Sequence, residues 1–215
     1  MMGAGLNLSR PLAVVTPTVD ADVLVVLAGA SASFTGRQVH QISGRHSEKG
    51  VRNALQRLCL QGLVSRTPAG SADLYELNRD HLAAEHVLGL ARMQAELWRR
   101  ISAMASGWRL VPLYVAVFGS AARGDMNLDS DIDLFVVRPD GLDIDDVDWV
   151  SQMGNLSDRV TAWTGNDTRV LEMKVAEVRA GLLTPEPVLI DIQRQGLALF
   201  GSTDFWLMNS PGEAQ

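Results

Sequence analysis

Hydrophobic residues in the first part of the chain follow helical spacing and then strand alternation. Val51, Leu55 and Leu58 recur at three- and four-residue steps after a capping serine, which is typical of a helix with one buried face. Two shorter helical patterns precede this segment, and two short apolar runs joined by a turn with proline and glycine follow it. The pattern predicts three helices and a hairpin over residues 18–79.

A different organisation begins after residue 79. Residues 80–106 carry one apolar stripe at helical spacing and predict a long linking helix. From residue 107 to residue 203 the pattern becomes rich in strands, with apolar runs at 113–118, 131–137 and 168–175. We therefore expect an α+β protein, in which a helical unit with a hairpin is followed by an α/β domain with a mixed sheet.

Composition permits two compact units and gives no sign of a membrane protein. The 215 residues are 47% hydrophobic, which is enough for two small cores. No apolar run reaches the roughly 18 residues that cross a bilayer, and the start of the chain lacks the pattern of a secretory leader. We expect a cytoplasmic protein without a membrane partner. Its one cysteine, Cys59, falls in an apolar helical pattern and is interpreted as a small core residue.

Charge separates the two parts of the chain. Residues 1–79 contain eight Lys/Arg and five Asp/Glu, a balance of +3, whereas the remaining residues contain eleven and twenty, a balance of −9. A mildly basic unit suits a polyanionic partner, and an acidic domain with clustered aspartates suits a divalent metal. Solvated acidic surfaces also produce such counts, so charge indicates different partners for the two parts without identifying them.

Residues 18–79 resemble the winged helix-turn-helix of bacterial transcription regulators, and the stretch ALQRLCLQGLVSRTPAGSADLYELN carries most of the resemblance. The family docks its third helix in the major groove of double-stranded DNA. The resemblance implies that the residues near the duplex are Arg45, Ser47, Lys49 and Arg52, with Arg66 on the wing. Winged helices also serve in dimerisation and protein docking, and the linking helix leaves a homodimer open.

A strand that begins with two alternating aspartates carries the candidate chemistry. Side chains alternate along a strand, so Asp131 and Asp133 share one face while Ile132 points to the other. Neighbouring carboxylates repel each other unless a cation lies between them, and Mg²⁺ prefers such oxygen ligands. The pattern predicts a magnesium site that orients a nucleoside triphosphate.

The stretch FGSAARGDMNLDSDIDLFVV is similar to the motif of minimal nucleotidyltransferases in the DNA polymerase β-like superfamily, in which Gly-Ser is followed ten residues later by Asp-x-Asp. The resemblance implies two Mg²⁺ ions, with Mn²⁺ as the alternative, held by the aspartates of the motif. It also implies contacts to the nucleotide from Gly119, Ser120, Arg123 and Ser130.

The same superfamily places a third carboxylate on a later strand, where it shares a metal and accepts the proton of the attacking hydroxyl. Within TRVLEMKV the candidate is Glu172, on the strand face away from Leu171, and Lys174 on its own face would meet phosphate. Relatives more often carry aspartate at this place. If the register of the strand differs, Asp167 is the alternative.

These features predict a metal-dependent nucleotidyltransferase that moves a nucleoside monophosphate, AMP from ATP, to a hydroxyl of a protein, an RNA or a small molecule. Minimal relatives include antitoxins that adenylylate a partner toxin, and a fused winged helix would let such a protein regulate its own operon. The alternative is a DNA-binding regulator whose nucleotidyltransferase fold senses nucleotide without catalysis. Both aspartates of the motif are present, which favours the enzyme.

Overall fold

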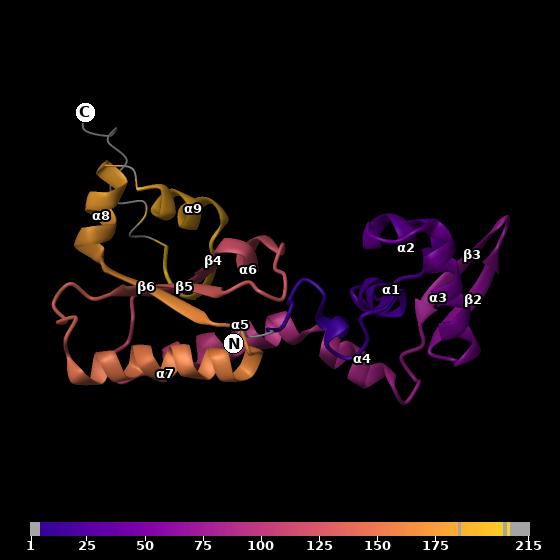
Figure 1. Ribbon diagram of the computed structural model, residues 1–215, viewed down its shortest axis with the longest axis horizontal. Helices are drawn as coiled ribbons and strands as arrows, with labels where there is room; N and C mark the ends of the chain where they lie inside the picture. The colour runs from indigo at the N-terminus through magenta and orange to yellow at the C-terminus, as the bar shows by residue number, and fades with distance from the viewer. Residues whose placement is uncertain (1–4, 185, 204–205, 207–215) are drawn as a thin grey trace. The chain divides into compact units, whose positions relative to one another are not determined.

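The computed structural model describes residues 5–184, 186–203 and 206, which divide into two units (Figure 1). One unit comprises Arg10–Gln94, and the other comprises the chain up to Ser9 together with the chain from Ala95 onward. Each unit buries hydrophobic clusters of its own. The segment from Gly5 to Ser9 thus belongs to the second unit, although it precedes the first unit in sequence.

The unit Arg10–Gln94 contains helices and a small antiparallel sheet. Its elements are η1 (Pro11–Val14), α1 (Val19–Ala28), β1 (Phe34–Thr35), α2 (Gly36–Ser43), α3 (Glu48–Leu60), β2 (Val64–Ala69), β3 (Ala72–Leu77) and α4 (Ala84–Ala91). The strands lie in the order β1-β3-β2, and β2 and β3 form the hairpin. The predicted stripe of α3 is buried in the core of this unit.

Side-chain caps fix where the central helices of this unit begin. Thr35 and Gln38 form a reciprocal capping box at the start of α2, and the Ser47 hydroxyl accepts a hydrogen bond from the Gly50 amide at the start of α3. Gly44 ends α2 with a positive φ of 62°. These local signals set the short turn between α2 and α3.

A buried ionic cluster joins Arg10, at the start of this unit, to α1 and to the turn before α3. Asp22 in α1 is 8% exposed, and it accepts hydrogen bonds from Arg10 at 2.7 Å and from His46 at 2.6 Å. Burial alone would raise the pKa of Asp22, but these hydrogen bonds outweigh burial and hold the pKa below its usual value. The cluster therefore stabilises the turn from which α3 starts.

The linking helix predicted over residues 80–106 is wrong as a single helix. The chain forms α4 and then α5 (Met93–Ser106), and between them Arg92 has φ −96° and ψ 7°, outside helical geometry. Val87 of α4 is buried in the core of the first unit, whereas Leu97 and Ile101 of α5 are buried in the second. The continuous apolar stripe is divided because its two halves pack into different cores.

The second unit is built on a mixed four-stranded sheet, in agreement with the predicted α+β class. After α5 its elements are β4 (Tyr114–Phe118), α6 (Gly119–Arg123), β5 (Ile132–Arg138), α7 (Val147–Thr164), β6 (Thr168–Lys174), α8 (Val175–Leu183), α9 (Pro187–Gln195) and β7 (Leu197–Gly201). The strand order is β6-β5-β4-β7. Only the β5–β6 pair is parallel among the strands described, and α7 connects the two.

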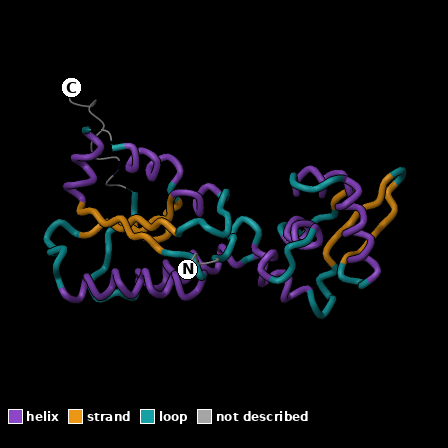
Figure 2. The backbone as a smooth tube through the Cα atoms, in the orientation of Figure 1, coloured by secondary structure: helices purple, strands orange, loops and turns teal. Residues whose placement is uncertain are grey.

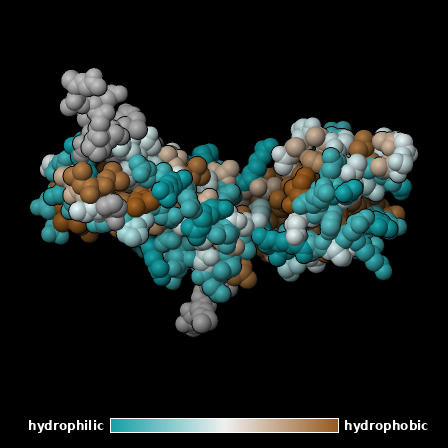
Figure 3. Space-filling view, turned by 90° about the horizontal axis from the view of Figure 1, so that it is seen from above, coloured by the Kyte–Doolittle hydropathy of each residue, from teal (hydrophilic) through white to brown (hydrophobic). Residues whose placement is uncertain are grey.

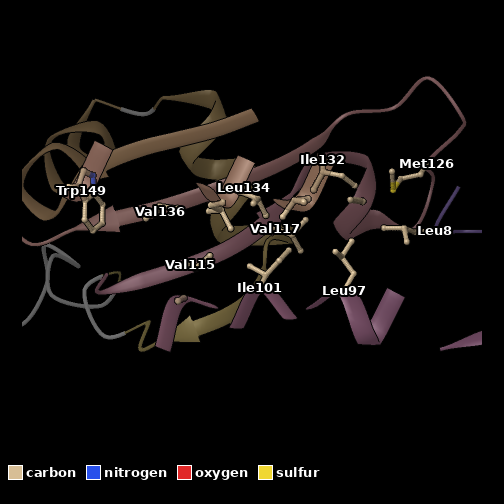
Figure 4. Close-up of a cluster of buried hydrophobic side chains, with 14 residues drawn as sticks. Leu8, Leu97, Ile101, Val115, Val117, Met126, Ile132, Leu134, Val136 and Trp149 are labelled. Carbon is tan, nitrogen blue, oxygen red and sulfur yellow. The ribbon is translucent and has the colours of Figure 1, made fainter. Parts of the chain in front are cut away.

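Helices cover both faces of this sheet. Helices α5 and α7 lie on one face, and α8 and α9 lie on the other (Figures 1 and 2). Figure 4 shows the first face, where Ile132, Leu134 and Val136 of β5 join Leu97 and Ile101 of α5 in one cluster. The odd-numbered β5 residues Phe135 and Val137 pack on the α8–α9 side instead. Even and odd positions of β5 thus mark the two faces.

The surface mixes polar and apolar residues. In Figure 3, hydrophilic residues cover most of the face that is drawn, and the hydrophobic residues form separate smaller areas. Among the described residues, no helix combines the length and the apolar character that a membrane span requires.

Candidate active site

Two aspartates lie together at the start of β5. Asp133 is the second residue of the strand, and Asp131 directly precedes it. Ile132 between them is fully buried in the cluster on the α5–α7 side, so strand alternation directs both carboxylates to the opposite face. The structure therefore brings this pair to the side of the sheet that carries α8 and α9.

The backbone of Gly119 lies directly against Asp133. Strands β4 and β5 are antiparallel and pair Phe118 with Asp133, so the next residue, Gly119, turns into α6 beside the carboxylate. Gly119 has φ +66°, and a Cβ atom at this position would lie 2.7 Å from Oδ2 of Asp133. Only glycine satisfies both the left-handed backbone and the close approach. The start of α6 and the aspartate pair consequently form one site.

Charges around Asp133 act in opposing directions. Burial is the main influence and raises the pKa of Asp133, and the negative charge of Asp131 acts in the same sense, whereas Arg169 and Arg123 act to lower it. The net pKa lies above the usual value. Arg123, in α6, pairs with Asp125 at 3.2 Å and reaches Asp191 of α9 at 3.8 Å. An additional positive charge beside the two arginines would therefore favour the ionised form of Asp133.

Arg169 occupies the place beside the aspartates on the neighbouring strand. The parallel register pairs Arg169 of β6 with Asp133, and its Nη2 atom lies 2.7 Å from Oδ2 of Asp131. The Arg169 side chain is 73% exposed and the Asp131 side chain 25%. The contact is an ion pair at the solvent boundary of the site.

The segment leading into Asp131 is held by a buried asparagine. Asn166, which is 2% exposed, donates from Nδ2 to the Ser130 carbonyl at 2.8 Å and accepts from the Leu6 amide at 2.9 Å. The Ser130 hydroxyl accepts from the Asn127 amide at 2.9 Å, so it organises its own loop. Asn166 thus ties the residue before Asp131 to the first described residues of the chain.

Glu172 does not join the aspartates, and the expectation that it supplies the third carboxylate is wrong for this structure. It pairs in register with Val136, which packs on the α7 side. Thr168, four residues earlier in β6, hydrogen-bonds to Thr161 of α7, so even-numbered β6 residues face α7. Asp133 faces the other side of the sheet. Glu172 instead accepts a hydrogen bond from Nε of Arg138 at 2.6 Å, with both side chains largely buried.

Lys174 is also distant from the aspartate pair. It stands opposite Arg138 at the far end of the β5–β6 pair, five residues along the strand from the level of Asp133. At roughly 3.3 Å per residue this corresponds to about 16 Å. The predicted phosphate contact from Lys174 is therefore not supported.

Asp167, the alternative carboxylate, lies at the edge of the sheet where the aspartates lie. Its backbone carbonyl accepts a hydrogen bond from the Ile132 amide at 2.8 Å.

Comparison with known proteins identifies this part of the chain. Residues 99–178 match the sequence profile of the family described as the nucleotidyltransferase domain. The chain contains a nucleotidyltransferase domain. Its enzyme class is therefore that of a transferase. The profile spans α6, the aspartate pair and β6, and hence every element that forms the site.

Two solved structures are similar to part of this chain. One is described as a toxin–antitoxin with AMP-PNP, with 22% identity over 54% of this chain and 77% of that chain and a TM-score of 0.32. The other is described as a nucleotidyltransferase from Sulfolobus solfataricus, with 20% identity over 50% of this chain and 78% of that chain and a TM-score of 0.30. A comparison with curated proteins finds no match. The family profile is thus the comparison on which the domain assignment rests.

The donor set of the nucleotidyltransferase domain fits Mg²⁺ bound together with a nucleotide. Among the described residues no three carboxylate, histidine or cysteine side chains gather into a metal cluster. Mg²⁺ commonly retains water and binds through one or two carboxylates plus substrate phosphates, so two carboxylates suffice when a triphosphate is present. A Cβ at Gly119 would collide with the Asp133 carboxylate, so glycine is what lets the turn approach this ligand.

Sequence reasoning did not assign Arg169 or Asn166 to the site. The position of Arg169 could have been predicted from the sequence. Arg169 lies near the start of β6, the aspartates lie at the start of β5, and neighbouring parallel strands begin at the same edge of a sheet. Asn166 carries no comparable signal, since its partners Ser130 and Leu6 are 36 and 160 residues away in sequence.

The basic residues expected near DNA lie in the other unit and are exposed. Arg45 is in the turn before α3, Lys49 and Arg52 are in α3, and Arg66 is in β2. Arg52 lies 3.6 Å from Glu48, and Arg66 lies 2.7 Å from Asp73. Such exposed pairs are weak, so they leave these side chains available to a stronger anion.

Proposed function

We propose that the nucleotidyltransferase domain transfers a nucleoside monophosphate, AMP from ATP, to a hydroxyl of a protein, an RNA or a small molecule. The observation that carries this proposal is the close approach of Gly119 to Asp133, which joins the Gly-Ser turn and the aspartate pair in one site. A phosphate-binding turn and two metal-binding carboxylates are the parts that phosphoryl transfer requires.

In this proposal Asp131 and Asp133 would hold Mg²⁺ together with the bound triphosphate. The bound ion would neutralise charge on the phosphates and on the departing pyrophosphate. The amides at the start of α6, at Gly119 and Ser120, have no partners within the helix and would donate to the triphosphate. Arg123 would add positive charge beside them, because its field already reaches Asp133.

The proton of the acceptor hydroxyl needs a separate group. Glu172 is paired with Arg138 on the other side of the sheet and is not proposed for this role. Asp167 is exposed, directly precedes β6 and lies at the same edge as the aspartates. We assign Asp167 as the carboxylate that would accept this proton.

Metal-dependent labelling tests the proposal. The purified protein is incubated with each nucleoside triphosphate labelled at the α-phosphate, together with Mg²⁺ and a host cell lysate. We expect label on a discrete protein or RNA band, strongest with ATP, and complete loss of label when EDTA removes the metal, because the carboxylates bind the triphosphate through Mg²⁺. Label that persists in EDTA would contradict the metal site.

The alternative function is a regulator that senses nucleotide without transferring it. Magnesium-dependent binding of a triphosphate with no labelled product, in lysate and with the protein alone, would favour this alternative. The presence of both aspartates favours the enzyme, since sensing by itself does not require two metal-binding carboxylates at the phosphate turn.

We further propose that the unit Arg10–Gln94 is a winged helix that binds double-stranded DNA. Its support is the order of α1, α2, α3 and the β2–β3 hairpin, together with exposed basic side chains on α3 and the hairpin. Those side chains would contact phosphate, which gives affinity that depends on salt and discriminates little between sequences. Ser47 would contribute indirectly, because its hydroxyl caps α3 and so fixes where that helix begins.

Replacing Lys49 and Arg52 together with alanine should weaken binding to a duplex of random sequence. Each phosphate contact adds about 0.9 to the slope of log affinity against log salt, so loss of two contacts should lower that slope by about 1.8. Fluorescence anisotropy between low and moderate salt measures it. The matched control replaces Arg79 and Arg92, which are exposed in the same unit but outside α3 and the hairpin. An unchanged slope in the α3 variant would place DNA elsewhere.

A further inference from the structure

Arg169 is unusual because it places a positive charge where a metal-dependent site is expected to have a third carboxylate. It stands opposite Asp133 in the parallel register, and its guanidinium contacts Asp131 at 2.7 Å. With Glu172 on the other sheet face, the immediate surroundings of the aspartates contain a cation that belongs to the chain itself. This arrangement gives Arg169 a role distinct from that of an ordinary surface arginine.

The Arg169–Asp131 pair is suited to exchange. The arginine side chain is 73% exposed, and ion pairs at such exposure contribute little to stability because water competes with them. A divalent ion carries twice the charge of a guanidinium and prefers carboxylate oxygens. The planar guanidinium, once released, matches the geometry of phosphate oxygens and binds them in a bidentate manner.

We propose that Arg169 is the resident counter-cation of the aspartate pair and becomes a ligand of the triphosphate when the metal–nucleotide complex binds. The inference rests on the function proposed above and extends it with a residue that the sequence did not assign. Arg123 does not take this role, because it is held between Asp125 and Asp191.

The exchange couples metal binding to nucleotide binding. Without nucleotide, a metal ion must displace Arg169 from Asp131, and the released guanidinium finds no new anionic partner. Metal alone therefore binds weakly. With nucleotide present the guanidinium obtains a phosphate partner, so metal and nucleotide each raise the affinity for the other. Arg169 thereby offsets part of the negative charge of the aspartates and disfavours metal occupation until a triphosphate arrives.

Titration with Mn²⁺, followed by electron paramagnetic resonance, tests the first half of this exchange. Without nucleotide, Arg169→Gln should bind Mn²⁺ about five- to tenfold more tightly than the wild type, because the competing cation is gone. The control Arg159→Gln removes the same charge from an exposed position on α7, on the other face of the sheet, and should leave Mn²⁺ affinity unchanged. Equal Mn²⁺ affinity in Arg169→Gln and the wild type would overturn the proposal.

A second titration with α,β-methylene-ATP tests the phosphate half. In saturating Mn²⁺, Arg169→Gln should bind this analogue about tenfold more weakly, since a charge-assisted bidentate contact is lost. Tighter metal binding with unchanged affinity for the analogue would show that Arg169 only competes with metal, which overturns its role at phosphate. If the wild type bound no Mn²⁺ even with the analogue, the proposed function itself would fail, and the inference with it.

Discussion

Asp133→Asn is expected to lower the rate of nucleotide transfer by about 10³-fold while making the domain more stable at neutral pH. Metal-assisted charge stabilisation is worth several kcal/mol, and each loss of about 1.4 kcal/mol is tenfold in rate. Asparagine keeps the shape of the side chain but removes the charge that binds the ion. The pair Asp131–Asp133 also loses its repulsion, which is why stability and activity should move in opposite directions.

The sign of the stability change follows from the raised pKa of Asp133. Burial is its main cause, so the folded protein binds a proton more readily than the unfolded chain does. Stability contributed by the protonated form is present at low pH and is lost as pH rises through the raised pKa. The advantage of Asp133→Asn over the wild type should therefore be fully developed at neutral pH and should vanish under acid conditions.

Thermal unfolding in EDTA across pH 3 to about 8, combined with the labelling assay, measures both effects. Asp158→Asn is the matched control, because Asp158 is exposed on α7 and outside the site. It should keep full transfer activity. Normal transfer by Asp133→Asn would contradict the metal site, and lower stability at neutral pH would contradict the environment described for Asp133.

Glu172→Ala is expected to destabilise the same unit by about 3 to 5 kcal/mol. The Arg138 side chain is 6% exposed and the Glu172 side chain 16%, so truncation leaves a buried guanidinium without its carboxylate. Arg138 also donates to the Leu142 carbonyl and so anchors the loop that leads to α7. Loss of its orientation should loosen the crossover between β5 and β6.

Urea unfolding followed by tryptophan fluorescence measures this change selectively. All five tryptophans, the last at position 206, lie in the unit that begins at Ala95, so their signal reports that unit and not the other. Asp148→Ala is the control, since it removes one partner of the exposed Arg109–Asp148 pair and should cost at most about 1 kcal/mol. A change in Glu172→Ala no larger than in this control would contradict the buried pair.

Glu172→Gln separates the two roles that this residue could have. Glutamine keeps an acceptor for Arg138 and should lose less stability than alanine. Because the side chain faces α7, the folded variant should retain Mn²⁺ binding with nucleotide and retain transfer. If a stably folded Glu172→Gln variant lost metal binding, the Glu172 carboxylate would be part of the active site after all.

Local patterns in the sequence are sufficient for much of this site. Alternation alone places Asp131 and Asp133 on one face of a strand, and a Gly-Ser turn at the end of the preceding strand predicts a neighbouring phosphate site. The α3 stripe and its serine cap follow equally from short-range rules. Each of these features depends on residues within one element or its immediate turn.

The position of Glu172 cannot be predicted from such local rules. Both faces of the sheet are covered by helices, so apolar residues line both faces of β6 and do not reveal which one carries the aspartates. The apolar stripe over residues 80–106 likewise gives no sign of the break at Arg92, because its two halves enter different cores. In both cases the deciding contacts lie far away in sequence.

The aspartate pair, the Gly119 turn, the Ser47 cap and the α+β class can be predicted from the sequence, because spacing within a strand or a helix turn fixes these features locally. Contacts between distant segments place Arg169 beside the aspartates, Glu172 against Arg138 and Asn166 against Ser130. The strands β5 and β6 are joined through α7, so their register depends on contacts between segments that are distant in sequence. A shift of one residue would exchange the faces, and no local pattern in β6 excludes it.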